Sequence, residues 1–134
     1  MRKIDKIIIH CTATPRGRDV TAAEIDAWHR RQGWNGIGYH YVVRLDGTVE
    51  AGRPEAIAGA HCRGQNSCSI GVVYVGGLDA DGTRPEDTRT PQQKAALKHV
   101  VGDLKRRYPH ATVHGHNEFA AKACPCFDVG TECF

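Results

Sequence analysis

The fold class is decided by the stretch KIIIHCT, residues Lys6–Thr12. It is rich in β-branched residues and apolar at successive positions, which is typical of a strand buried on both faces of a sheet. Such a sheet needs helices to cover it. We therefore expect an α/β protein, and His10, near the carboxyl end of this strand, becomes a candidate site residue.

Strand and helix signals alternate along the rest of the chain. Thr21 and Glu24 form a capping box before a helix with an apolar face, and this helix should stop at Gly33. Thr90 and Pro91 give the N-cap and first turn of a second, longer helix. Strands are predicted over residues 39–43, 48–51, 69–75 and 111–114, the first two joined by a turn at Asp46-Gly47. These elements predict a central mixed β-sheet flanked by helices.

The composition restricts the number of domains and the classes of partner that can be expected. The 134 residues, 40% hydrophobic and 25% charged, suit a single compact domain over residues 1–134, and we expect a monomer. The formal charge of +3 is too small to indicate a nucleic-acid partner. No run approaches the roughly 18 apolar residues of a membrane anchor, and no signal peptide is recognisable. We therefore expect synthesis in the cytoplasm, with the six cysteines as free thiols or metal ligands.

Three candidate ligands fall at strand ends or in the loops beyond them, namely His10, His116 and Cys124. Zinc suits this set because imidazole nitrogen and thiolate are its preferred ligands, and three protein ligands leave a fourth position for a water molecule. Such an open site would suit hydrolysis of an amide. Spacing alone does not choose between His114 and His116, or between Cys124 and Cys126.

Six ordered motifs cover nearly the whole chain. They are IIIHCTAT at Ile7–Thr14, WHRRQGW at Trp28–Trp34, GYHYVV at Gly38–Val43, DGTVEAGR at Asp46–Arg53, SIGVVYVGG at Ser69–Gly77 and GHNEFAAKACPCFD at Gly115–Asp128. In these motifs the chain resembles the zinc-dependent N-acetylmuramoyl-L-alanine amidases, specifically the amidase-type lysozymes of phages and, more distantly, the peptidoglycan recognition proteins. The resemblance implies hydrolysis of the amide bond between N-acetylmuramic acid and L-alanine in bacterial peptidoglycan, leading to lysis of the cell wall.

The resemblance also assigns site residues. It makes His10, His116 and Cys124 the ligands of Zn²⁺, because His116 rather than His114 matches the histidine of the motif.

Three further roles follow from the same motifs. The resemblance implies that Tyr39 orients or deprotonates the attacking water, and that Lys122 stabilises the developing oxyanion. His61 matches a groove position and is expected to touch the substrate.

Two cysteines depart from the family pattern. Cys68 stands where relatives commonly carry asparagine and is expected to alter substrate contacts. Cys126 stands where serine is usual, and its thiol could compete for zinc or become oxidised. Cys11 alternates to the face opposite His10 and is interpreted as a buried apolar residue.

Neighbouring aromatic residues receive a structural interpretation. Trp28, His29 and Trp34 lie at or near helical spacing and are predicted to pack in the core or at the helix end. Tyr41 should share a face with Tyr39 if their strand is regular, so only the motif position selects Tyr39.

Two rival functions accompany this hypothesis. One is a module that binds peptidoglycan without cutting it, although such relatives typically lack the cysteine ligand that Cys124 supplies here. The other is a regulatory contact with an intracellular protein partner, for which the sequence offers no signal. A wall hydrolase without a signal peptide would reach the wall or periplasm through lysis-associated release or dedicated secretion.

Overall fold

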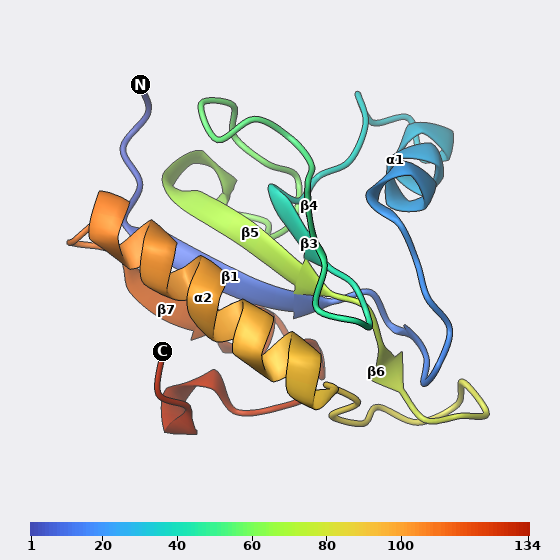
Figure 1. Cartoon of the computed structure of the whole chain (residues 1–134). Coiled ribbons are helices and arrows are strands. Elements are labelled where there is room, and N and C mark those ends of the chain that lie inside the picture. The colour runs from blue at the N-terminus through green and yellow to red at the C-terminus, as the bar shows by residue number, and fades with distance from the viewer.

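The computed structural model describes all 134 residues, and a five-stranded sheet forms its centre (Figure 1). The strands are β1 (Lys6–Cys11), β3 (Tyr41–Val43), β4 (Val49–Ala51), β5 (Ser69–Tyr74) and β7 (Thr112–Gly115). Their order across the sheet is β4-β3-β5-β1-β7. All neighbours are parallel except the β3–β4 hairpin, so the predicted mixed sheet is confirmed. Two short strands, β2 (Thr14–Pro15) and β6 (Gly77–Leu78), form a separate parallel pair.

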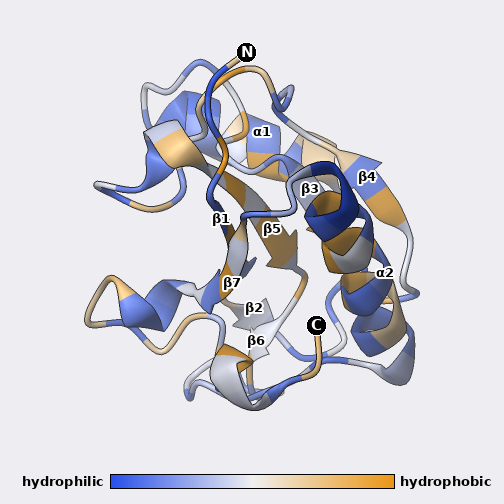
Figure 2. Ribbon diagram, turned by 90° about the vertical axis from the view of Figure 1, so that its left-hand side faces the viewer, coloured by the Kyte–Doolittle hydropathy of each residue, from blue (hydrophilic) through white to orange (hydrophobic).

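Helices α1 (Ala22–Arg31) and α2 (Pro91–Arg107) cover opposite faces of the sheet. The α2 side holds the larger core, a cluster of 14 buried residues, and the α1 side holds a cluster of six. Alternate residues of β5 enter each cluster, since Val72 and Tyr74 face α2 while Val73 faces α1. Hydrophobic and hydrophilic segments alternate along α2 in Figure 2, as expected of a helix that is buried on one side. Neither helix is both long and apolar enough to cross a bilayer.

Both helix starts follow the sequence signals. Thr21 and Glu24 make the predicted capping box, and Thr90 makes an equivalent box with Gln93. The Gln93 side chain is fully buried and donates a hydrogen bond to the backbone oxygen of Val75 at 2.9 Å. This bond ties the first turn of α2 to the chain just after β5.

The expectation that Tyr39 and Tyr41 share a face is wrong. Strand β3 begins only at Tyr41, which packs on the α2 side, whereas Tyr39 packs on the α1 side. The backbone bends at His40, whose N–H donates to Gly71 at 2.9 Å while its oxygen accepts from Gly52 at 2.8 Å. These bonds continue the register of β3 with β5 and β4, so the alternation is lost through the bend of the backbone at His40.

Replacing Leu97 tests the larger core. Leu97 is fully buried on α2, so Leu97→Ala leaves a cavity and should lower the free energy of unfolding by about 2–5 kcal/mol in urea denaturation. Lys98→Ala, on the exposed side of the same helix, should change it by less than about 0.5 kcal/mol. Equal effects of the two substitutions would contradict this assignment of the core.

Candidate active site

Two histidines meet at the carboxyl edge of the sheet. His10 is near the end of β1, and His116 follows directly after β7, where a 3₁₀ turn spans His116–Glu118. Ile9 pairs with Gly115 across the parallel strands, so the two histidines are the next residues in the same register. Their ring centroids lie 4.6 Å apart. The strand register therefore brings together residues that are far apart in sequence.

Cys124 completes the group from the C-terminal segment. One donor atom each from His10, His116 and Cys124 lies within 4.8 Å of the others. The backbone N–H of Cys11 donates to the Cys124 sulfur at 3.2 Å, and this sulfur lies 3.8 Å from Nδ1 of His10. Hydrogen bonding from Cys11 lowers the pKa of the Cys124 thiol and outweighs burial, which acts in the opposite direction. The lower pKa favours the thiolate.

The two residues that spacing could not exclude lie elsewhere. His114 uses Nδ1 to contact Glu118 at 2.8 Å and is no part of the group of three. Cys126 directs its sulfur toward the Cys11 sulfur at 3.8 Å and the Gly77 oxygen at 3.3 Å. Burial raises the pKa of Cys126 to about 12, so this thiol stays protonated. The expected competition of Cys126 for zinc finds no support in this geometry.

The donor set fits zinc. Two imidazoles and one thiolate are typical of a catalytic zinc site with a free fourth position. His10 is buried, and its Nε2 is 2.8 Å from Nδ1 of His61, which leaves Nδ1 of His10 free to face the sulfur of Cys124. The three residues thus form a candidate metal site.

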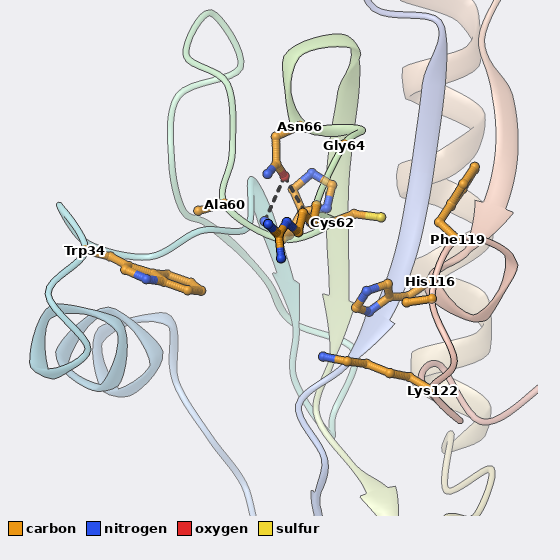
Figure 3. A pocket seen from close by; sticks show the side chains of 11 residues that line it. Trp34, Ala60, Cys62, Gly64, Asn66, His116, Phe119 and Lys122 are labelled. Atoms are coloured by element: carbon orange, nitrogen blue, oxygen red, sulfur yellow. Dashed lines mark hydrogen bonds between the residues drawn. The ribbon is translucent and has the colours of Figure 1, made fainter.

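An open cleft of about 450 Å³ adjoins this group (Figure 3). Trp34 lies on one side of it, and His116, Phe119 and Lys122 lie on the other, with the Lys122 amine directed toward the cleft. The remaining lining residues are Ala60, His61, Cys62, Arg63, Gly64, Asn66 and Ala120. The cleft therefore combines aromatic surfaces with two cationic side chains.

Trp34 has a second role besides the one predicted from sequence. Its ring packs against His29 at the end of α1, with ring centroids 4.5 Å apart, as predicted, and its side chain also lines the cleft and is 40% exposed. His29 does have the predicted structural role, because its Nδ1 accepts a hydrogen bond from the Gly38 N–H at 2.9 Å. The only available signal for Trp34 was its place just after the glycine that ends the helix.

Arg63, Asn66 and Phe119 were also missed. Arg63 and Asn66 lie between the quoted motifs, whereas Phe119 lies inside the motif Gly115–Asp128 but had no role assigned to it. Cys68, which was expected to alter substrate contacts, is not among the lining residues, and its sulfur instead lies 3.5 Å from the backbone oxygen of Gln65.

Tyr39 and Lys122 flank the candidate metal site. The Tyr39 ring lies 5.2 Å from the His10 ring, and burial, followed by the nearby Cys124, raises the pKa of its phenol. Burial and then the Lys122 ammonium lower the pKa of His116, which keeps that imidazole in the neutral form that a metal requires.

His61 lines the cleft, but both of its ring nitrogens form hydrogen bonds with other side chains of the protein. Its Nδ1 meets His10 at 2.8 Å and its Nε2 meets the Ser69 hydroxyl at 3.2 Å. Burial, reinforced by repulsion from His40, lowers the pKa of His61 to about 3, so the ring is neutral. Both polar atoms of this side chain are therefore occupied by protein groups.

A mixed sheet with a His-His-Cys group at its carboxyl edge, opening into a polar cleft, defines a candidate metal-dependent hydrolase. The family model for N-acetylmuramoyl-L-alanine amidase matches residues 1–127. The chain belongs to this amidase family. The predicted family and enzyme class are thereby confirmed.

Individual proteins similar to this chain support the family assignment. An endolysin of Enterobacteria phage K11 is 47% identical over 128 residues, covering 96% of this chain and 84% of the phage protein. The solved structure of the endolysin N-acetylmuramoyl-L-alanine amidase LysCS from Clostridium intestinale is 31% identical, with a TM-score of 0.80 over 92% of this chain and 76% of that one. Bumblebee PGRP-SA, 24% identical with a TM-score of 0.78 over 93% of this chain and 77% of that one, shares the fold.

Proposed function

We propose that this amidase is a zinc enzyme that hydrolyses the bond between N-acetylmuramic acid and L-alanine in bacterial peptidoglycan. The observation that carries the proposal is the convergence of His10, His116 and Cys124 within 4.8 Å beside an open cleft. When bound, zinc supplies a Lewis acid that polarises the scissile carbonyl and activates water near neutral pH.

The three ligands have complementary tasks. The neutral imidazoles of His10 and His116 donate nitrogen lone pairs, and the Cys124 thiolate adds one negative charge. The N–H of Cys11 donates a hydrogen bond to the Cys124 sulfur at 3.2 Å. This bond would reduce the negative charge that the thiolate donates to the zinc ion.

Tyr39 orients the attacking water. Its ring packs 5.2 Å from the ring of His10, and burial raises its pKa, so its hydroxyl stays protonated at neutral pH in the absence of a cation. A neutral hydroxyl can donate one hydrogen bond and accept another, which suits a group that aligns water against a carbonyl.

Lys122 stabilises the oxyanion that forms when the carbonyl is attacked. Its amine points into the cleft on the side of His116 (Figure 3). A fixed positive charge at that position favours the tetrahedral intermediate over the neutral amide.

The cleft holds the substrate. Its open form suits a polymer that must enter sideways, and Trp34 and Phe119 offer apolar surfaces to sugar and peptide on opposite sides (Figure 3). Arg63 offers a cation to the carboxylates of a stem peptide.

The products of wall digestion test this function. Purified zinc-loaded protein incubated with bacterial cell walls should release new amino-terminal alanine and no new reducing sugar. New reducing ends would identify glycosidase chemistry and overturn the proposal. Tight wall binding without any release would favour the non-catalytic binding module.

The route to the wall follows from the relatives. Because the chain is similar to phage endolysins, we propose that it acts on the cell wall during lysis of a host.

A further inference from the structure

We propose that His61 and Ser69 form a hydrogen-bonded relay that fixes the His10 imidazole with Nδ1 toward the metal. This role makes them positioning residues rather than substrate-binding residues. The inference rests on the proposed function, because it assumes that His10 is a metal ligand. It replaces the expected contact between His61 and the substrate.

The hydrogen-bond partners allow only one assignment of the ring protons of His10 and His61. Nδ1 of His10 faces the Cys124 sulfur at 3.8 Å, and a ligating nitrogen carries no proton, so the proton of this ring is on Nε2. That N–H donates to Nδ1 of His61 at 2.8 Å, which places the His61 proton on Nε2.

The relay then ends on the backbone. Nε2–H of His61 donates to the Ser69 oxygen at 3.2 Å, and the Ser69 hydroxyl donates to the Gln65 carbonyl at 2.7 Å. His10, His61 and Ser69 each donate one hydrogen bond to the next group. The last acceptor is the Gln65 carbonyl oxygen, which has no proton to donate, so the direction of all three bonds is fixed. The backbone of Gln65 therefore selects the tautomer of His10 through two intervening side chains.

The packing around His61 holds its ring in this position. A Cβ atom on Gly71 would lie 2.6 Å from the ring, and one on Gly59 would also lie 2.6 Å from it, so the ring occupies space that both glycines leave open. The oxygen of the Asn66 side chain accepts from the N–H groups of His61 and Cys62, each at 2.9 Å, which anchors the loop. Ser69 itself is fully buried.

This arrangement separates two roles for His61. Both of its ring nitrogens are used inside the protein, so a hydrogen bond to substrate would have to break the relay. A positioning role predicts weaker zinc binding when the relay is cut. A substrate-binding role predicts a higher KM with zinc binding unchanged.

Zinc affinity, measured by competition with a chromophoric chelator, tests the relay. Second-shell partners of zinc ligands typically contribute 10- to 100-fold in affinity, so His61→Ala should weaken zinc binding by about that factor and Ser69→Ala by about 10-fold. His61→Asn keeps an acceptor near the position of Nδ1 and should recover part of the loss. Ser67→Ala, at an exposed position next to the relay, is the matched control and should bind zinc as the unmodified protein does.

Kinetics on a soluble N-acetylmuramoyl peptide complete the test. With saturating zinc, Ser69→Ala should lower kcat and leave KM within about twofold. The relay is overturned if His61→Ala and Ser69→Ala fold, bind zinc as tightly as the unmodified protein and raise only KM. If the unmodified protein itself binds no zinc, the proposed function fails instead.

Discussion

Cys124→Ser is expected to abolish peptidoglycan hydrolysis and most zinc binding, whereas Cys126→Ser should affect neither. The thiolate is one of three candidate ligands, and a serine hydroxyl is neutral and a poor donor to zinc near neutral pH. Losing several kcal/mol of metal stabilisation corresponds to a fall in kcat/KM of at least about 10³-fold.

Cys126 is a closely matched control. It lies two residues away on the same segment, but its sulfur contacts Cys11 and Gly77 rather than the histidines. Zinc content by metal analysis and release of amino-terminal alanine should be measured on the same samples of both variants. Full activity in Cys124→Ser, or equal loss in both variants, would contradict the assignment of Cys124 as the ligand.

Lys122→Met is expected to lower kcat by about 10²- to 10³-fold while zinc content stays unchanged. The substitution keeps the length of the side chain and removes only the ammonium that points into the cleft. Because the charge matters most when the oxyanion forms, the loss should appear in kcat rather than in KM.

Lys98→Met provides the comparison for charge alone. Lys98 is exposed on α2, away from the cleft, so its substitution changes the net charge equally without touching the site. Both variants should be assayed on a soluble N-acetylmuramoyl peptide, which removes the electrostatic attraction of the whole wall. A rise in KM alone for Lys122→Met would mean that the lysine binds substrate and does not stabilise the oxyanion.

Much of the fold could be predicted because its signals are local. The apolar run at Ile7–Ile9, the caps at Thr21 and Thr90 and the turn at Asp46-Gly47 each act within a few residues, and the structure confirms the elements that they indicate. The bend at His40 could not be predicted, since residues 39–43 have the pattern of one regular strand.

The site was predictable only through the family motifs. Spacing could not separate His114 from His116, because the choice depends on which strand β7 pairs with and in what register. The place of Trp34 in the cleft could not be predicted for a similar reason. Its local pattern is that of a helix end, and only the tertiary fold makes it a wall of the cleft.

The two sides of the cleft are supported by hydrophobic clusters of different size. Trp34 follows α1, which is backed by six buried residues, while the segment that carries Cys124 packs against the cluster of 14. A region with fewer buried contacts opens at a lower free-energy cost. Local opening on the Trp34 side is therefore expected to cost less free energy than opening on the Cys124 side, which hydrogen exchange of the two segments would measure.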